Sequence, residues 1–370
     1  MNYARAMAAH GHAVTVFFPG PIALPWRVDN EQVRVCSCPH WLSSLSIRGG
    51  FGPGEVAYKC VQLLAHRFDF IHVCPGHRPA NLVSAWLAKH IRGSMIVDEW
   101  WEWFGRGGCA DQRKGLVGAC VAIYDSLVEL PSKHLYDGVI AITRGLRNRL
   151  RGHAHVDVLP GGAEVNALMK FDLAESRRVL GLDENLLILG MSGLTDNDHN
   201  DNMPLFDAVR HLSKEVPNLR LLATGDSAYI ADRVQPLLSP EVLLNVGWVD
   251  FGAYNRHLTA CDAFMLPFPD TGRNRCRWPN KIGDYLALDR PIITNPTGDL
   301  ASLSAEYERI HLCPNTSAAY QAAIRTLAGG QLQKAPRRPR SQGRVLSFDG
   351  RVDRILAFYE QLQTHRRKTA

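Results

Sequence analysis

The sequence predicts an α/β protein with two Rossmann-like domains, each a doubly wound parallel sheet. The chain has 370 residues, which suits two domains of ordinary size. Short, nearly continuous apolar runs alternate with segments of helical period, and this is typical of parallel strands covered on both faces. These runs fall into two series, so we expect two sheets, each with a ligand crevice at the carboxyl ends of its strands.

The first series opens with a helical segment and not with a strand. Its predicted strands follow at 13–19, 33–39, 68–76, 93–100, 137–143 and 155–160. A doubly wound domain normally opens with a strand and a glycine turn, and neither precedes residue 13 here. We therefore expect the first strand of this sheet to be missing, through a truncated or misassigned start, which would leave unpaired strand edges.

The second series predicts a further sheet after a break in the rhythm near 161–184. Its predicted strands are 185–193, 219–225, 242–248, 263–268, 291–294 and 309–314. The basic, Pro/Gly-rich stretch 329–344 reads as a connector, and apolar residues at helical spacing after it predict a last helix. We assign residues 1–165 to an N-terminal domain, 166–345 to a C-terminal domain, and 346–370 to a last helix.

Composition limits the class of partner. The net charge is +6, a mild excess that falls short of a nucleic-acid binder. Nine scattered cysteines include no Cys-x-x-Cys pair, so we expect reduced thiols and no metal site. No signal peptide or apolar run of about 18 residues is present. We expect a cytoplasmic protein, with peripheral contact with the inner face of a membrane left open.

The stretch "NRCRWPNKIGDYLALDRPIITN" carries the strongest chemical pattern. A helix begins near Pro279, and its free backbone N–H groups favour a phosphate. Lys281 lies in its first turn, and a basic loop precedes it. Asp284, one turn further, suits two vicinal hydroxyls of a ribose. This pattern predicts a nucleotide diphosphate, while the alternative is that Lys281 and Asp284 only favour the helix dipole or the surface.

Three further turns at strand ends support a crevice. "MSGLTDNDHND" places Gly193 after the first strand of the second domain, and "ATGDSA" places Gly225 and Asp226 after the next. In "NVGWVD", Trp248 and Val249 could meet a base by stacking or through the backbone. Glycine turns also simply join strands to helices, so each alone is weak evidence.

Together these segments resemble a GT-B glycosyltransferase of family 4. "NYARAMAAHGHAVTVFFPG", "YDGVIAITRGLRNRL" and "VDVLPGGAEVNAL" are similar to the first domain of that family. "PNLRLLATGDSA", "VGWVDFGAYNRHLTACDAFMLPF" and "PNKIGDYLALDRPIIT" are similar to its donor domain, in order and spacing. The resemblance implies retaining transfer from a nucleotide-diphosphate sugar, without a metal ion or cofactor, between two Rossmann-like domains. It places Asp284 as the ribose-binding acid, with Lys281 and Asn280 in the "PNK" motif.

The donor domain also departs from the family. The family's first acid, eight positions before Asp284, is Cys276 here, and the diphosphate-binding Arg and Lys after Gly193 are absent. Thr195 and Asn197 stand in that turn among three acids that would repel a diphosphate. We infer that four cations supply the missing charge: Arg273, Arg275, Arg277 and Lys281. The acidic turn could instead hold a cation, or simply be a solvated capped turn.

The first domain departs as well. Where relatives place a histidine after the fourth strand, this chain has Asp98 and Glu99, and either could act as a base on an acceptor. An exposed acid at a strand end is the alternative. His72 and His77 are the nearest histidines, and His77 follows a strand end, where sites are common. We predict that Asp98, Glu99 and His77 are catalytic.

Aromatic residues crowd beside these acids. Trp100, Trp101 and Trp103 fall within four positions and predict an acceptor wall, a membrane-facing belt or ordinary core. The sequence thus predicts a retaining, metal-independent hexosyl-type glycosyltransferase whose acceptor is a small molecule, a glycan or a lipid-linked group. A non-catalytic nucleotide-sugar binder or partner subunit is the alternative, and an epimerase of nucleotide sugars is the third. The base, the sugar and the acceptor stay open.

Overall fold

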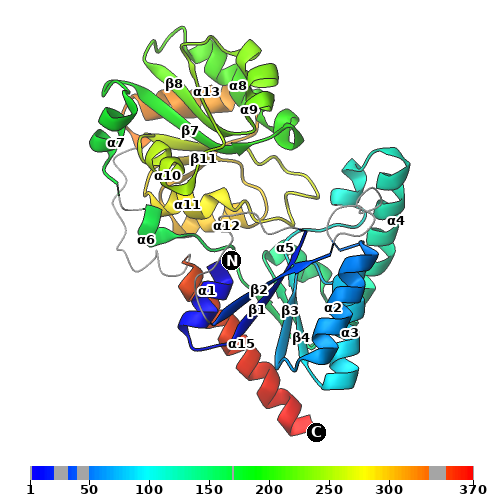
Figure 1. Cartoon of the computed structure of the whole chain (residues 1–370). Coiled ribbons are helices and arrows are strands. Elements are labelled where there is room, and N and C mark those ends of the chain that lie inside the picture. The colour runs from blue at the N-terminus through cyan, green and yellow to red at the C-terminus, as the bar shows by residue number, and fades with distance from the viewer. Residues whose placement is uncertain (1, 21–31, 40–49, 169–170, 333–346, 370) are drawn as a thin grey trace. The chain divides into compact units, whose positions relative to one another are not determined.

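The computed structural model describes residues 2–20, 32–39, 50–168, 171–332 and 347–369 (Figure 1). Most of the predicted connector, 329–344, lies outside these residues. The chain divides into two compact units. Unit 1 comprises Met1–Gly161, Cys276–Trp278 and Phe348–Ala370, and unit 2 comprises Gly162–Arg275 and Pro279–Ser347.

Unit 2 contains one parallel sheet of six strands in the order β12-β11-β10-β7-β8-β9. From β7 outward this is the standard doubly wound arrangement, in which the chain first builds one half and then returns to build the other. The strands are β7 (Leu187–Leu194), β8 (Leu219–Gly225), β9 (Leu243–Gly247), β10 (Ala263–Leu266), β11 (Ile292–Thr294) and β12 (Ile310–Leu312).

Helices cover both faces of this sheet. Figure 1 shows α8 (His199–Leu212) and α13 (Ser317–Ala328) on one face, and α10 (Phe251–Thr259), α11 (Lys281–Ala287) and α12 (Asp299–Glu306) on the other. A buried apolar cluster joins β7, β8 and β10 to α8 and α13. The remaining elements are α6 (Val165–Leu168), α7 (Leu173–Leu180), η3 (Asp196–Asp198), α9 (Ser227–Tyr229), η4 (Ile230–Val234) and η5 (Gln235–Leu237).

Unit 1 has two separate parallel sheets among its described residues. One pairs β1 (Val14–Pro19) with β2 (Val33–Cys38), and the other has the order β3-β4-β5-β6. The strands of the second sheet are β3 (Phe70–Val73), β4 (Met95–Trp100), β5 (Gly138–Ala141) and β6 (Val156–Val158). The expected interruption of this domain's sheet is therefore seen between β1 and β3.

Helix α15 (Phe348–Thr369) packs on the larger sheet of unit 1, and α1 (Asn2–Ala9) packs on the smaller one. α15 lays Ile355, Phe358 and Leu362 against Met95, Val97 and Ile140 of the larger sheet. The other elements are α2 (Pro53–Ala65), α3 (Pro79–Arg92), η1 (Cys109–Gln112), α4 (Gly115–Ser132), η2 (Lys133–Leu135) and α5 (Arg144–Arg149). The prediction of two Rossmann-like α/β domains is confirmed.

Candidate functional site

The switch point of the unit 2 sheet lies between β7 and β10. The two strands pair directly, with Ala263 opposite Leu189 and Phe264 opposite Gly190. The chain leaves them toward opposite halves of the sheet, and such a point opens a crevice at the carboxyl ends of the strands. Gly193 near the end of β7 and the loop after β10 therefore lie where a ligand is expected.

Gly193 and Lys281 come together at this point. Gly193 adopts a left-handed φ of +62°, and its N–H donates to Thr224 Oγ1 at 3.2 Å. The Lys281 ammonium donates to the carbonyl oxygen of Gly193 at 3.3 Å. A Cβ on residue 193 would lie 3.3 Å from Lys281 Cε, so glycine leaves room for the lysine to cross the turn. The structure thus joins two predicted donor-site residues that are far apart in the sequence.

Asp284 lies one turn into α11 and is partly buried. Its Oδ2 accepts a hydrogen bond from the Tyr254 hydroxyl at 2.8 Å. Burial raises the pKa of Asp284 to about 6, although the bond from Tyr254 lowers it. An ionised carboxylate has about four acceptor positions, so Asp284 keeps capacity for hydroxyl groups of a ligand. Sequence reasoning missed Tyr254, because nothing in the sequence shows that α10 faces α11.

The turn after β8 depends on backbone geometry. Gly225 has a φ of +140°, and a Cβ there would lie 2.3 Å from the Leu194 carbonyl oxygen. Asp226 accepts hydrogen bonds from the N–H groups of Ala228 and Tyr229 at 3.0 and 3.2 Å, so it is the N-cap of α9. These contacts account for Gly225 and Asp226 structurally, and their predicted contact with a nucleotide stays a prediction.

Trp248 follows β9 with its side chain in solvent. It is 67% exposed, and Val249 beside it is half-buried. An indole this exposed on a strand-end turn is available for stacking on a base. The structure assigns it no role in the core.

The three acids after Gly193 have protein partners. Asp196 pairs with Arg233 at 3.3 Å, and Asp198 lies 3.8 Å from an Arg273 nitrogen. Asp201 accepts a hydrogen bond from the Asn274 side chain at 3.4 Å. These partners offset the negative charge that the sequence predicts would repel a diphosphate. Thr195 is half-buried and Asn197 is exposed in the same turn.

The predicted cluster of arginines is divided. Arg275 is exposed and bonds Asp270 with two nitrogens at 2.6 Å each, and Arg273 approaches Asp198. Arg277 belongs to unit 1, whereas the other three cations belong to unit 2. Asn280 is exposed at the N-cap of α11 and makes no side-chain capping bond. Within unit 2, Lys281 is thus the predicted cation that directly reaches the Gly193 turn.

In unit 1, Asp98 is fully buried near the carboxyl end of β4. It accepts hydrogen bonds from the Gly76 N–H at 2.9 Å and from Trp100 Nε1 at 2.7 Å. Burial raises its pKa to about 7, against these hydrogen bonds. A carboxyl group that titrates near neutral pH can act as a general base or acid.

Glu99 is buried between His72 and Arg351. It accepts a hydrogen bond from His72 Nε2 at 2.9 Å and pairs with Arg351 of α15. Burial would raise the pKa of Glu99, but the bond from His72 and the charge of Arg351 outweigh it and lower that pKa. Arg351 also donates to the carbonyl oxygens of Leu159 and Pro160, so it ties α15 to the strand edge. Sequence reasoning missed this arginine, because it lies about 250 residues away from its partner.

His77 is buried against α4. Its Nε2 lies 3.1 Å from Asp125, which also pairs with Arg78 and Arg113. Burial lowers the pKa of His77, although Asp125 opposes this effect. The structure does not bring His77 into one hydrogen-bonded group with Asp98 or Glu99, so the three predicted catalytic residues have separate partners.

The three tryptophans differ in exposure. Trp100 and Trp103 are 4% and 6% exposed, with ring centroids 6.1 Å apart, and Trp103 is covered by the Arg149 guanidinium. Trp101 is 36% exposed. Of these three, Trp101 alone offers a substantial surface for an acceptor.

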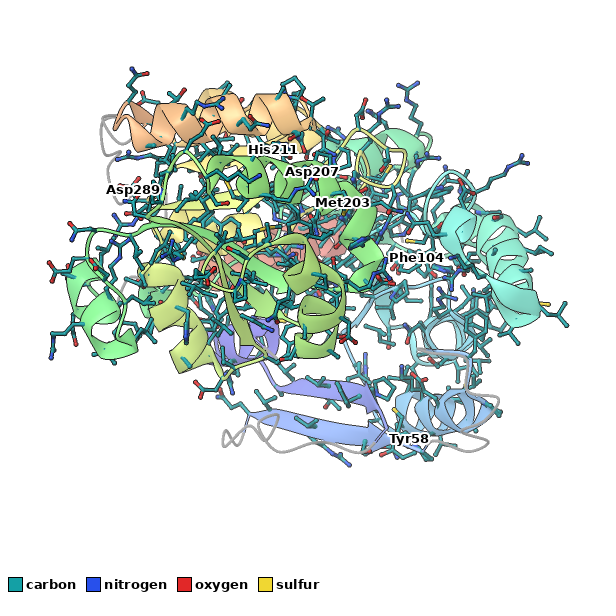
Figure 2. The ribbon with its side chains drawn as sticks, turned by 90° about the horizontal axis from the view of Figure 1, so that it is seen from above. Tyr58, Phe104, Met203, Asp207, His211 and Asp289 are labelled. Carbon is teal, nitrogen blue, oxygen red and sulfur yellow. The ribbon has the colours of Figure 1, made fainter. Side chains whose placement is uncertain are left out.

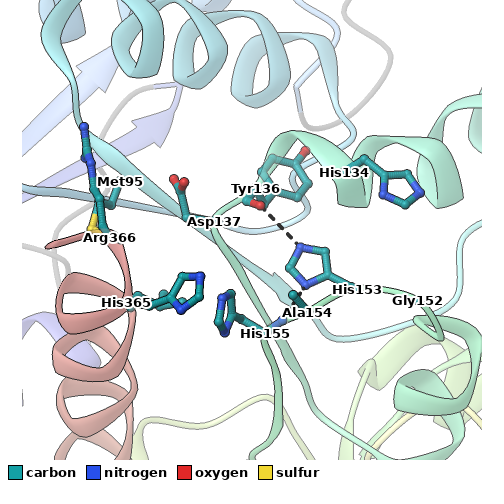
Figure 3. A pocket seen from close by; sticks show the side chains of 11 residues that line it. Met95, His134, Tyr136, Asp137, Gly152, His153, Ala154, His155, His365 and Arg366 are labelled. Atoms are coloured by element: carbon teal, nitrogen blue, oxygen red, sulfur yellow. Dashed lines mark hydrogen bonds between the residues drawn. The ribbon is translucent and has the colours of Figure 1, made fainter. Parts of the chain in front are cut away.

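The remaining cavity and metal candidates do not extend the site. A cavity of about 420 Å³ in unit 1 is lined by His134, His153, His155 and His365 (Figure 3). It lies where β5 and β6 begin, the opposite edge of the sheet from the end of β4. Across the described residues, no group of three or more His, Cys, Asp or Glu side chains could hold a metal ion.

The comparisons with known proteins bear on this geometry. Residues 1–162 match the model of the glycosyl transferase 4-like domain. Sucrose-phosphate synthase from Thermosynechococcus elongatus is 16% identical over 99% of this chain and 91% of its own, with a TM-score of 0.68. The chain has the GT-B fold. A glycosyltransferase from Rickettsia africae is 13% identical over 98% and 93% of the two chains, with a TM-score of 0.69.

A third GT-B relative is known with a nucleotide. HepE from Anabaena, whose structure holds UDP, is 14% identical over 96% of this chain and 99% of its own, with a TM-score of 0.58. None of the curated proteins matches the chain. The predicted GT-B fold is confirmed.

Proposed function

We propose that this GT-B chain is a retaining glycosyltransferase that binds a nucleotide-diphosphate sugar at the carboxyl edge of the unit 2 sheet. The observation that carries the proposal is the contact of Lys281 with the Gly193 turn beside the switch point, at 3.3 Å. A phosphate would lie at this turn, and Asp284, in the same helix as Lys281 and about one turn further on, would accept hydrogen bonds from the ribose hydroxyls. HepE, a chain of similar fold, is known in complex with UDP, which supports a nucleotide as the ligand.

In the proposed reaction the bond between the anomeric carbon and the diphosphate oxygen breaks. The nucleotide diphosphate leaves with the electron pair, and Lys281 stabilises the charge that develops on it. The acceptor oxygen bonds the same carbon from the same face, and its proton passes to the departing diphosphate or to a base. Asp98 is the candidate base, because its pKa of about 7 suits proton transfer near neutral pH. No metal ion takes part in this scheme.

The alternative is a non-catalytic nucleotide-sugar binder. The observation that favours it is in unit 1, where Glu99 and His77 are each held by buried charged partners. Such residues can be explained by the stability of the unit alone. Binding without transfer or donor hydrolysis would support this alternative.

A thermal-shift panel with UDP, GDP, ADP, dTDP and CMP tests the donor site. A ligand that binds only the folded protein raises Tm by mass action. We expect one nucleotide to raise Tm in the wild type and in Asp207→Ala, but not in Asp284→Ala. Asp207 is a matched control, since it is an exposed carboxylate of the same unit whose partner is Arg210 (Figure 2). No shift with any nucleotide would contradict the proposal.

The chemistry needs a second measurement with the nucleotide that binds. Its sugar conjugates are incubated with candidate acceptors, with and without EDTA, and the anomeric configuration of the product is read by NMR. Retention of configuration, unaffected by EDTA, is the expected result. Inversion would contradict the retaining mechanism, and altered sugar stereochemistry in the donor itself would indicate an epimerase.

A further inference from the structure

Helix α4 of unit 1 exposes its apolar side. Leu116, Ile123 and Leu127 are 84%, 61% and 68% exposed, and Val117 and Leu130 are exposed as well. Leu116, Cys120, Ile123, Leu127 and Leu130 recur every three or four positions, so they form one stripe along the helix. We call this stripe, with Val117, the α4 face. Figure 1 shows the helix at the edge of unit 1, and Figure 2 shows side chains that point outward from it.

The two charged residues of α4 point inward. Asp125 is buried with Arg78 and Arg113 as ion-pair partners at 2.9 and 2.7 Å. Glu129 is buried, and its carboxylate accepts hydrogen bonds from the backbone N–H groups of Phe104 and Gly105. A helix on a protein surface normally turns its charges to water and its leucines to the core, and α4 does the reverse.

This arrangement is expected of a surface that is covered in use. Gly115–Ser132 contains no lysine or arginine, and both its acids are buried, so the exposed side of α4 carries no charge. Contiguous exposed apolar patches of this kind mark contact with a protein or a membrane. The predicted tryptophan belt does not supply this surface, because Trp100 and Trp103 are buried.

We propose that the α4 face docks unit 1 on the surface of a lipid bilayer with anionic headgroups. Basic side chains stand beside the helix: Lys114 immediately precedes it, Arg106 lies in the loop that packs on Glu129, and both are exposed. At the C-terminal end of α4, the Lys133 ammonium donates a hydrogen bond to the carbonyl oxygen of Arg151. The exposed Arg151 therefore lies beside this end of the helix. The acid Asp111 is also exposed near Lys114. The excess is basic, as an anionic surface requires.

The helix lies along the bilayer surface in this proposal and does not cross it. By length and composition, Gly115–Leu135 could span a membrane, the one such helix in the described part of the chain. However, Asp125 and Glu129 are held in the interior of unit 1 by ion pairs and hydrogen bonds. Only the outer side of the helix, the α4 face, is therefore available to enter lipid. An apolar face with basic residues at the two ends of the helix suits a helix that lies in the bilayer interface.

A second copy of the chain is the competing occupant. The three-or-four spacing of the α4 face would suit helix pairing, but charged residues normally flank such a seam and select the partner. The positions beside the seam are uncharged, among them Ala119, Ala122 and Ser126. The uncharged flanks favour lipid over a paired helix.

Vesicle flotation tests the proposal. We compare the wild type with a face variant, Leu116→Ser/Ile123→Ser/Leu127→Ser, on vesicles of phosphatidylcholine alone or mixed with phosphatidylglycerol. Val61→Ser/Ile91→Ser is the matched control, since both residues are 61% exposed on α2 and α3 of the same unit. We expect the wild type and the control to float with the anionic vesicles, more weakly at high salt, and the face variant to lose at least tenfold in bound fraction.

Two further readouts keep the outcome clear. Leu127→Glu places a single charge in the α4 face, and we expect it to lose binding while circular dichroism and Tm match the wild type. Failure of the wild type to bind either vesicle would overturn the proposal. So would a dimer in lipid-free light scattering that the face variant converts to monomers, because the occupant would then be a second copy. The readout needs no donor, so it is independent of the proposed transferase activity.

Discussion

Asp284 of unit 2 and Glu99 of unit 1 are held in opposite ways. Asp284 accepts a hydrogen bond from the neutral hydroxyl of Tyr254, and its pKa is raised to about 6. Glu99 accepts a hydrogen bond from His72 and pairs with the buried Arg351, and its pKa is lowered. An acid held by a neutral donor keeps acceptor capacity for a ligand, whereas one paired with a buried arginine is committed to the fold. The presence of an acid near the carboxyl edge of a sheet does not by itself separate these two roles.

The sheets of the two units also differ in their continuity. Unit 2 has six strands in one continuous parallel sheet, while the described strands of unit 1 form two separate sheets. Unit 1 is joined across its elements by buried charges, such as Arg351 of α15 on the end of β4. In unit 2, the turn at Gly225 depends on backbone geometry, because a Cβ there would lie 2.3 Å from the Leu194 carbonyl oxygen. The predictions below test this contrast, from the largest expected effect to the smallest.

Arg351→Met tests whether the buried pair supports unit 1. Removing the cation leaves Glu99 buried without its main counter-charge, which should cost about 3–5 kcal/mol of unfolding free energy. Arg354→Met is the control, since Arg354 lies on the same helix but pairs with Asp157 at the surface, at 3.4 Å. Its loss should cost less than about 1 kcal/mol. Urea denaturation measures both, and equal effects would contradict the contrast.

Gly225→Ala tests the backbone dependence of unit 2. The φ of +140° and the contact with the Leu194 carbonyl oxygen leave no room for a Cβ. We expect a loss of about 2–4 kcal/mol from strain and displacement of that strand end. Gly181→Ala is the control, because its φ of +66° is also left-handed but nothing lies within 4 Å of the added atom. It should lose only about 1 kcal/mol, and a loss as large as that of Gly225→Ala would refute the steric explanation.

The pH dependence of stability tests Asp98. Its pKa is raised from 3.8 to about 7 in the folded state, so between these values the folded protein binds more protons than the unfolded chain. Stability should therefore rise as pH falls, by roughly 2 kcal/mol between pH 7 and pH 5. Asp98→Asn places an amide between the same two donors and lowers stability throughout. It should remove only this part of the slope, because burial also raises the pKa of Glu129 to about 8 and that of Asp284 to about 6. An unchanged slope in the variant would assign it to other groups.

Much of the fold could be predicted from the sequence, because apolar strands in series carry a strong period. The runs 219–225 and 263–268 contain β8 and β10, and the expected interruption of the first sheet was found. The helix predicted near Pro279 begins two residues later, at Lys281, and ends at Ala287. A single helical turn precedes Lys281, in which the Ile282 N–H bonds the Pro279 carbonyl oxygen.

The candidate site could be predicted only in part. Strand-end positions pointed to Gly193 and Asp284, because the edge of a parallel sheet follows from the order of strands. The partners could not be predicted: Tyr254 for Asp284 and Arg351 for Glu99 come from elements distant in sequence. The inward-facing charges of α4 were also missed, because Asp125 and Glu129 look like ordinary solvated acids until their partners are known.

The pH dependence of nucleotide binding sharpens the contrast at Asp284 itself. Hydrogen bonds from two ribose hydroxyls favour the ionised carboxylate, and a pKa of about 6 means that most Asp284 is protonated at pH 5. The apparent Kd of the nucleotide that gives a thermal shift should therefore rise about tenfold between pH 8 and pH 5, roughly 1.4 kcal/mol. Isothermal titration calorimetry at both pH values measures this change.

Asp284→Asn separates this effect from titration of the diphosphate, which also gains a proton in that range. The variant should bind more weakly at pH 8 and show a smaller change on acidification, because its amide does not titrate. If wild type and variant lose affinity by the same factor, the phosphate accounts for the pH effect and Asp284 does not read the ribose as an ionised acid. If only the wild type loses this further affinity on acidification, Asp284 binds the ribose as an ionised carboxylate. Glu99 of unit 1, by contrast, is enclosed by its protein partners.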